Sequence, residues 1–316
     1  MTMTNMERLM SRLVRLKSLE LHGRGGEDLV NGQRWQTITN HLQTFNFMIG
    51  LSSGISVDNL DSFRSPFWLI EKKWYVAYNT SDFLFTVPYF ARTRGDEKFQ
   101  PPILSTVPDP NIFHQCITRL TLSRSVFEIK QRFPQVDVLV LSTPIVFSLI
   151  EEIVDLNRIQ RLILSSTTNF DGISFLISSL PNLHRISLID NIKSYLKQLH
   201  EGSFPKIQSL EIGSFYSLTA TSPTSNRYDL KQLAMIFPRV KHLHIRHRCS
   251  TRKILGFIHR FTQLNNASFR FTQSYLYSEC VLDHIAEIQS SFDKYRSAQR
   301  HDFTYRFGSQ SVYVWL

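Results

Sequence analysis

One pattern of apolar and polar positions recurs along the chain: apolar, proline, any residue, apolar, two of any kind, apolar, any, apolar. The segments that fit it are residues 133–141, 180–188, 204–212 and 237–245. Proline lacks an amide donor and moves the residue before it out of the helical region, so each copy marks the end of a helix. The alternation that follows predicts a short strand with one buried face.

The spacing of these strands indicates a repeat. The apolar residue two before the end of each motif, with weaker copies added, gives the series Leu19, Phe45, Leu120, Leu139, Leu162, Ile186, Leu210, Leu243 and Ala267. Successive intervals are 26, 75, 19, 23, 24, 24, 33 and 24 residues. Most fall within the window of about 20–29 residues that leucine-rich repeats use, and 75 is about three such units. We therefore predict an α/β fold, a leucine-rich-repeat solenoid over residues 1–316, with parallel strands on its concave face and helices on its convex face.

Helical periodicity follows most of the predicted strands. Thr143 and Pro144 are expected to open one helix, whose apolar face would begin at Val146. Residues 48–116 interrupt the pattern and are expected to be an irregular, aromatic-rich insertion, densest between 60 and 100, or degenerate repeats; alternation within them predicts strands at 74–78 and 83–87. Residues 300–316 predict a C-terminal capping hairpin. No helix that would cover the first apolar layer is evident before Leu13.

The amino-acid composition indicates a folded, basic protein that has no disulfide framework. The apolar share of 42% is ample for a core, and the formal net charge of +10 favours anionic partners without saying which kind. The cysteines Cys116, Cys249 and Cys280 are too few and scattered for a disulfide framework, which suits a reducing compartment. No apolar run is long enough for a membrane span, so an intracellular protein, cytoplasmic or nuclear, is expected.

The chain resembles the leucine-rich-repeat region of F-box proteins, especially the large invertebrate families of this kind. Beside the proline-led strands, the resemblance rests on residues 61–69 (DSFRSPFWL), on residues 73–76 (KWYV) and on the tail 311–316 (SVYVWL). It implies the substrate-binding part of a cullin-type ubiquitin ligase receptor, or of a relative that lacks the F-box. The residues before Leu13 are too few for an F-box, so a ligase adaptor is expected as a partner only if an F-box precedes this sequence.

Residues between the buried strand positions should point into the concavity of such an array. A basic column results, and its predicted members are Arg119, Arg161, Arg185, His242, His244, Arg246 and Arg270. Because arginine pairs bidentately with carboxylates and phosphates, this column is a candidate surface for a protein partner with an acidic or phosphorylated segment. The alternative, that these are solvated residues of an ordinary strand face, stands beside it.

Other chemistry finds little support in the sequence. His242 and His244 share a strand face, but strong cations surround them and no paired-cysteine spacing is present, so no metal site is expected. No phosphate-binding loop or nucleophile motif is recognisable, so neither a cofactor nor an enzyme activity is predicted. A basic nucleic-acid-binding protein is the alternative function, although the positive charges are spread through the chain and no recognition motif accompanies them.

Overall fold

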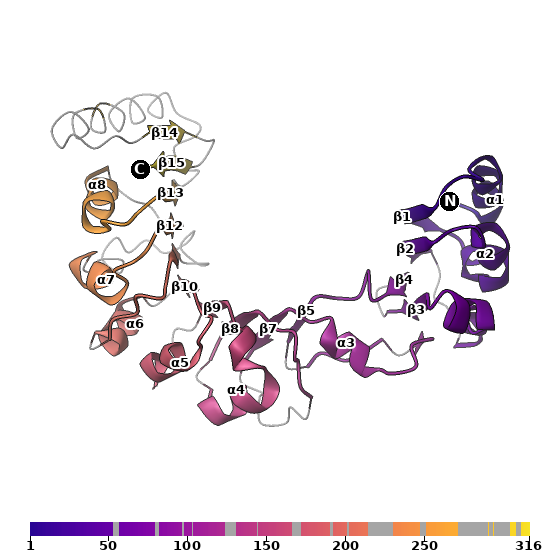
Figure 1. The fold of residues 1–316 in the computed structure, drawn as a ribbon, viewed down its shortest axis with the longest axis horizontal. Helices are drawn as coiled ribbons and strands as arrows, with labels where there is room; N and C mark the ends of the chain where they lie inside the picture. Colours follow the sequence, from indigo (N-terminus) through magenta and orange to yellow (C-terminus); the bar gives the residue numbers. More distant parts are fainter. Residues whose placement is uncertain are drawn as a thin grey trace. The chain divides into compact units, whose positions relative to one another are not determined.

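The chain folds into two compact units, Met1–Thr118 and Arg119–Leu316, and each is described by itself. The computed structural model describes residues 1–52, 57–79, 82–96, 98–102, 104–123, 131–143, 145–165, 172–189, 192–200, 202–213, 230–246, 251–270, 290, 293, 304–307 and 311–316. Both units mix helices with parallel strands, as the α/β prediction requires (Figure 1). Within the described residues, no helix combines the length and apolarity needed to cross a membrane.

The first unit begins with two helix-strand pairs. Its elements are α1 (Met3–Arg12), β1 (Ser18–Gly25), the 3-10 helix η1 (Glu27–Val30), α2 (Gly32–Thr39) and β2 (Thr44–Leu51). β1 and β2 are parallel, with Leu19 opposite Phe45, so the register predicted from the first two markers is confirmed. The aromatic side chains of β2 are buried and pack against Trp35 of α2.

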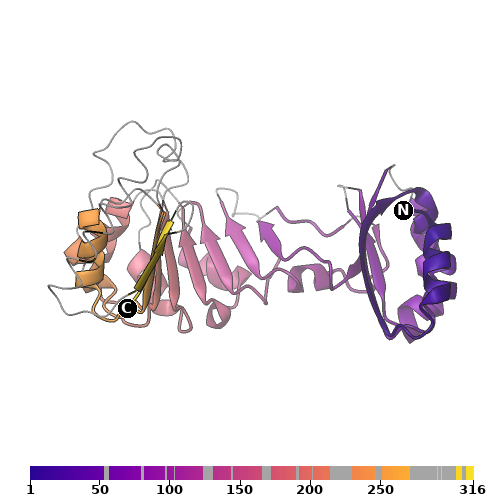
Figure 2. The same ribbon diagram turned by 90° about the horizontal axis from the view of Figure 1, so that it is seen from above.

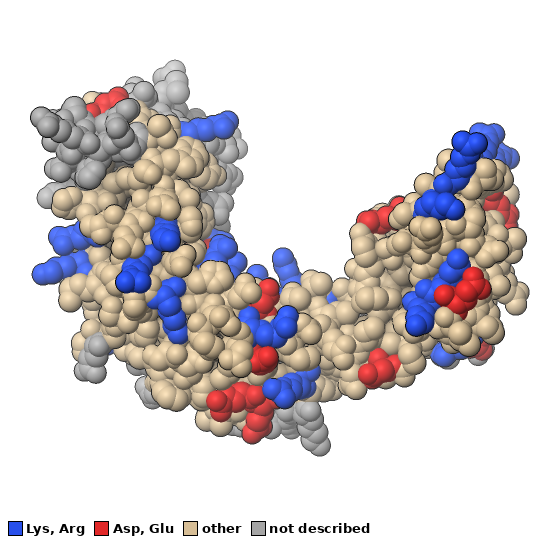
Figure 3. Space-filling model, in the orientation of Figure 1, with Lys and Arg blue, Asp and Glu red and all other residues tan. Residues whose placement is uncertain are grey.

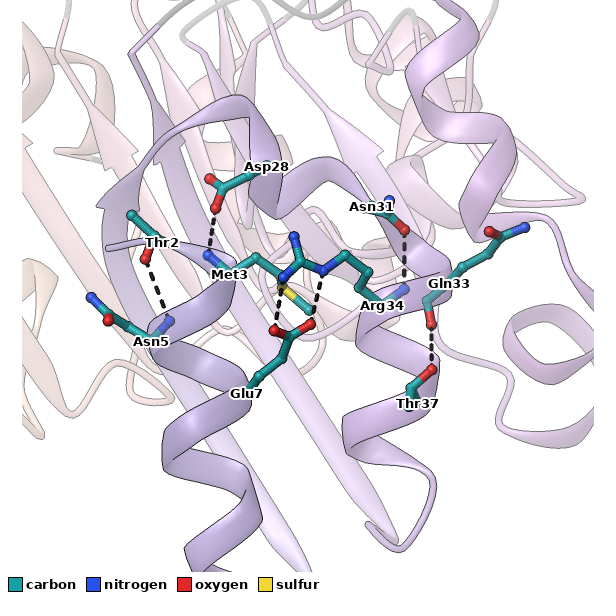
Figure 4. Close-up of polar contacts among 9 residues, drawn as sticks. All are labelled: Thr2, Met3, Asn5, Glu7, Asp28, Asn31, Gln33, Arg34 and Thr37. Carbon is teal, nitrogen blue, oxygen red and sulfur yellow. Dashed lines mark hydrogen bonds and ion pairs between the residues drawn. The ribbon is translucent and has the colours of Figure 1, made fainter.

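Helix α1 corrects the expectation that no helix covers the apolar layer before Leu13. Met3, Met6 and Met10 are buried in the core of the first unit, at the spacing of one helix face. The Thr2 side chain accepts a hydrogen bond from the amide of Asn5 and caps the helix, as Figure 4 shows. No proline-led motif precedes these methionines, so the repeat pattern that predicts the later elements gives no signal for this helix.

Helices α1 and α2 are held together by a bidentate ion pair. Arg34 Nε and Nη2 each donate to a different carboxylate oxygen of Glu7 at 2.8 Å (Figure 4). This hydrogen bonding, with the charge of Arg34, lowers the pKa of Glu7 below its ordinary value, although burial of the carboxylate opposes the shift.

The remainder of the first unit is antiparallel and aromatic-rich. Its elements are η2 (Val57–Phe63), the π-helix η3 (Phe67–Glu71), β3 (Tyr75–Tyr78), β4 (Phe83–Val87), β5 (Arg94–Asp96), β6 (Leu104–Ser105) and α3 (Asn111–Gln115). β3 and β4 pair antiparallel, which confirms the strands predicted from alternation at 74–78 and 83–87. They extend a five-stranded sheet in the order β1–β2–β4–β3–β6. Phe63 and Trp68 are fully buried, so both belong to the core of this unit.

The second unit contains a run of parallel strands with helices on one side (Figures 1 and 2). Its strands, in spatial and chain order, are β7 (Arg119–Leu122), β8 (Val138–Leu141), β9 (Arg161–Leu164), β10 (Arg185–Ile189), β11 (Ser209–Gly213), β12 (His242–Ile245) and β13 (Asn266–Arg270). Between them lie α4 (Phe147–Ile153), η5 (Leu156–Arg158), α5 (Ile173–Ser179), α6 (Ile192–Leu199), α7 (Leu230–Ile236) and α8 (Thr251–Arg260). The markers Leu139, Leu162, Ile186 and Leu210 are register partners on neighbouring strands, as the periodicity predicts.

One helix start differs from the prediction. The backbone of Val146 is extended, and α4 begins only at Phe147, so Val146 is an exposed capping residue and not part of the apolar face. Pro144 lies outside the described residues. The predicted N-cap at Thr143 was wrong because a preference for capping residues does not by itself determine where the backbone becomes helical.

Near its C-terminal end the second unit contains a hairpin. β14 (Thr304–Phe307) and β15 (Ser311–Trp315) pair antiparallel, and β15 also pairs antiparallel with β13. The hairpin therefore extends the sheet beyond β13 in the order β13–β15–β14. Val312 and Val314 are fully buried on one side of β15. These strands fall where the sequence predicts a capping hairpin, while a single array over 1–316 stays a prediction.

Candidate functional site

One face of the second unit's sheet is turned away from the buried markers Leu139, Leu162, Ile186 and Leu210. Side chains alternate along a strand, so residues on either side of each buried marker share this face, which we call the strand face. Strand register aligns them in two rows. The first row is Arg119, Val138, Arg161, Arg185, Ser209, His242 and Asn266, and the second is Thr121, Val140, Ile163, Ser187, Glu211, His244 and Ser268.

The structure places five of the predicted site residues in these rows. Arg119, Arg161, Arg185 and His242 lie in the first row, and His244 lies in the second. Arg246 follows β12 directly. Arg270 ends β13, but its side chain lies outside the described residues.

Glu211 brings three of the predicted arginines together. This carboxylate is only 2% exposed, and its Oε2 lies 2.6 Å from Arg161 Nη2. Its Oε1 lies 2.5 Å from Arg246 Nη2, and Arg185 Nη2 is 4.0 Å from Oε2. The Ser187 hydroxyl also donates to Oε2, at 2.8 Å, and Arg161 Nη2 lies 3.2 Å from the same hydroxyl. We call these five residues, Arg161, Arg185, Ser187, Glu211 and Arg246, the Glu211 cluster.

The electrostatics of Glu211 are dominated by its neighbours. Burial acts to raise the pKa of this carboxyl group, because a charged group loses hydration there. The hydrogen bond from Ser187 and the positive charges of Arg246, Arg161 and His244 outweigh burial, so the pKa of Glu211 lies below its ordinary value. Glu211 is therefore ionised at neutral pH.

The Glu211 cluster carries more positive than negative charge. Three guanidinium groups lie within 4.0 Å of one carboxylate. Burial lowers the pKa of Arg161, and repulsion from Arg185 and Arg119 lowers it further, although the charge of Glu211 opposes the shift. Among the described residues, neither the Nε of Arg161 nor that of Arg185 has a hydrogen-bond partner, although both atoms are buried. The cluster therefore combines an excess of positive charge with two guanidinium N–H groups that have no partner among the described residues.

Because Gly213 has no side chain, Arg246 can pack closely beside it and reach Glu211. A Cβ atom on Gly213 would lie 3.0 Å from Arg246 Cβ and 3.3 Å from its Cδ, which is tighter than ordinary packing. The sequence pattern predicts Arg246 as a site residue and places Ser187 and Glu211 on the same strand face, but it assigns neither these two residues nor Gly213 to the site. The signal in the sequence was an acidic residue, Glu211, at a strand position next to the basic column.

An apolar patch adjoins the cluster on the same face. Val140, Ile163 and Ile189 form a buried cluster of their own, with Val138 packed against it. The strand face thus combines largely buried apolar side chains on β8 and β9 with excess positive charge on β9 to β12.

The first unit carries a separate open groove of about 680 Å³. It is lined by Glu27, Asp28, Val30, Asn31, Gln33, Arg34, Asp61 and Ser62. Its arginine is already bound to Glu7, and Asp28 accepts a hydrogen bond from the amide of Met3. Arg34 therefore joins α2 to α1, and Asp28 joins η1 to α1. None of the predicted site residues lines this groove.

In the part of the chain that the structure describes, no group of three or more His, Cys, Asp or Glu side chains is arranged to bind a metal ion.

No protein-family model matches the chain, and no curated protein matches it either. The class of site therefore rests on the strand face itself, a sheet surface that combines clustered arginines with adjoining apolar side chains.

Proposed function

We propose that this chain is a protein-recognition module that binds an acidic or phosphorylated segment of a partner on the strand face of its second unit. The observation that carries the proposal is the excess of three guanidinium groups over one buried carboxylate in the Glu211 cluster. Arginine pairs with carboxylate and phosphate through parallel, charge-assisted hydrogen bonds, so a partly desolvated arginine cluster favours these ligands.

The fold class within this proposal is the leucine-rich-repeat solenoid. Its support is the strand register, in which markers about two dozen residues apart in sequence lie opposite each other on parallel strands. A unit of this size cannot bury its own apolar face, so successive units must stack. Strand side chains then form a continuous recognition surface.

The biological class within this proposal is the substrate-binding part of an F-box-type ubiquitin ligase receptor, or of a relative that lacks the F-box. Its support is the resemblance in the proline-led strands and in residues 61–69, 73–76 and 311–316. Affinity purification of the native protein, followed by mass spectrometry, tests this class. Co-purification of the ligase adaptor would support a receptor, whereas its absence would exclude an adaptor-bound receptor and leave the recognition module standing.

The recognition surface is tested by charge reversal at Arg185. This side chain is 44% exposed and lies 4.0 Å from Glu211, so Arg185→Glu leaves the two shorter ion pairs of Glu211 in place. Arg158→Glu, at an exposed residue of η5, is the matched control. We expect Arg185→Glu to release partners that wild type and Arg158→Glu retain. Retention of every partner by Arg185→Glu would overturn the proposal.

Nucleic acid binding is the competing outcome of the same experiment. Lys and Arg side chains in the visible face are dispersed among other residues and do not form one continuous stripe (Figure 3). Backbone binding to RNA or DNA requires cations that follow the strand and weakens steeply with salt. Nuclease-sensitive, salt-sensitive recovery of bulk RNA or DNA, unchanged by Arg185→Glu, would favour this alternative.

A further inference from the structure

Two aromatic side chains of β15 stand exposed beside each other. Tyr313 and Trp315 are 43% and 44% exposed, and their ring centroids lie 6.3 Å apart with an interplanar angle of 26°. The residues that alternate with them, Val312 and Val314, are fully buried. Two large rings that remain in water on a regular strand are a frequent feature of binding surfaces, because a ligand that covers them releases apolar area from water.

Strand register places this aromatic pair on the strand face. Tyr313 lies opposite Ser268, and Trp315 lies opposite Asn266. Ser268 and Asn266 belong to the second and first rows of that face, so the aromatic pair continues both rows beyond β13. The Glu211 cluster and the aromatic pair are therefore two chemically different parts of one surface.

The separation of the two parts sets a length for their ligand. The Nη2 atoms of Arg161 and Arg185 reach to within 4.0 Å of Glu211 Oε2, so the distance is measured from β11, which carries Glu211. From β11 to β15 there are three strand spacings, through β12 and β13. Neighbouring strands lie about 4.8 Å apart, so the separation is roughly 14 Å. An extended peptide advances about 3.3 Å per residue and covers this distance in about four residues.

The residues between the two parts suit a peptide backbone. Over β12 and β13 the rows carry His242, His244, Asn266 and Ser268. The His244 ring is hydrogen-bonded to the Ser268 hydroxyl. Imidazole, amide and hydroxyl groups can donate to and accept from peptide groups. A nucleic-acid strand would instead need further cations along β12 and β13 to follow its successive phosphates.

We propose that the strand face binds an extended peptide bearing a carboxylate or phosphate and, about four residues away, a large apolar side chain. The anion contacts Arg185 and Arg161, and the apolar side chain packs on Tyr313 and Trp315. This inference rests on the proposed function and adds a second determinant to it. Arginine and tryptophan are both enriched among residues that dominate binding energy at interfaces.

The test uses fluorescein-labelled Gly/Ser peptides and the full chain. One series carries a single phosphoserine with leucine two, four or eight residues away, a second carries glutamate in place of phosphoserine, and a third lacks leucine. Trp315→Ser removes the larger ring, Trp315→Phe retains an aromatic face, and Phe175→Ser changes an exposed aromatic residue of α5 as the matched control. Fluorescence anisotropy gives the affinities, and circular dichroism checks that each variant is folded.

We expect wild type to prefer the spacing of four, and Trp315→Ser to bind that peptide about tenfold more weakly. Trp315→Phe and Phe175→Ser should retain most of the affinity, and Trp315→Ser should not change binding of the peptide without leucine. Anion-dependent binding that ignores both leucine and Trp315 would overturn this inference and leave the proposed function intact. If no peptide binds wild type, both proposals fail for these ligands. Preferential, Trp315-dependent binding of a single-stranded oligonucleotide would overturn both in favour of nucleic acid.

Discussion

Glu211 Oε2 accepts a hydrogen bond from Arg161 Nη2 at 2.6 Å, although 50 positions separate the two residues in sequence. The bond reaches from β11 across β10 to β9, and Ser187 of β10 donates to the same oxygen. One buried carboxylate therefore organises side chains from three consecutive strands. Its loss should affect both the stability of the sheet and the charge of its surface.

Replacement of Glu211 by glutamine should destabilise the second unit. The neutral amide leaves Arg161 and Arg246 without their carboxylate and can no longer accept every hydrogen bond at this buried site. Because the arginines are partly exposed, we expect a loss of about 1–3 kcal/mol in the free energy of unfolding, measured by urea denaturation. Glu151→Gln, on the exposed side of α4, should stay within about 0.5 kcal/mol of wild type. Equal values for the two variants would contradict a structural role for Glu211.

The stabilising effect of Glu211 should depend on pH. Its pKa is lowered in the folded protein, so its contribution is complete above the pKa of an unfolded glutamate and is lost as pH falls through the lower, folded value. The difference in unfolding free energy between wild type and Glu211→Gln should therefore shrink from about pH 5 downward. Glu7 and Glu20 also have lowered pKa values, but both variants retain them. A difference that stays constant between about pH 7 and pH 3 would mean that Glu211 keeps its ordinary pKa.

Enlargement of Gly213 should move Arg246 away from Glu211. The added side chain of Gly213→Val occupies the space beside Arg246 Cβ and Cδ. Because the charge of Arg246 contributes to lowering the pKa of Glu211, that pKa should rise in this variant, as followed by NMR of the Glu211 carboxyl carbon. Arg246→Met should raise it in the same direction. A rise in Arg246→Met with no change in Gly213→Val would show that the close approach is not required.

In the first unit, Trp35→Phe should lower the free energy of unfolding. Trp35 is fully buried, and its Nε1 donates to the Leu29 carbonyl at 2.7 Å. Phenylalanine leaves that carbonyl without its donor, so we expect a loss of about 1–3 kcal/mol of unfolding free energy. Tyr89→Phe removes an exposed hydrogen bond to Glu20 and should cost far less. Denaturation profiles of the two variants that coincide would contradict this ranking.

The sequence predicted strand positions well because their signal is local. Proline-led motifs predicted the markers Leu139, Ile186 and Leu210, and a weaker copy without the proline predicted Leu162. The register of these markers in the sheet follows the same spacing. Helix α1 was missed because its buried methionines carry no such motif. Val146 was placed wrongly because a helix start depends on backbone geometry that cap preferences alone do not determine.

The site was predicted only in part for a similar reason. Equivalent strand positions identified Arg161 and Arg185, since register requires only the repeat. The role of Glu211 could not be deduced in this way, because it depends on how far guanidinium groups reach across neighbouring strands. The same holds for Tyr313 and Trp315, which join the strand face only because β15 pairs antiparallel with β13.

Site-specific photo-crosslinking tests the central claim, that partners bind the strand face, most directly. A photoreactive amino acid would replace exposed His242, between the Glu211 cluster and the aromatic pair, or exposed Ser178 of α5 as the control. We predict crosslinks from position 242 to an acidic or phosphorylated segment of a partner, lost when Arg185→Glu is added, and none from position 178. Crosslinks confined to position 178, or unaffected by Arg185→Glu, would contradict the account.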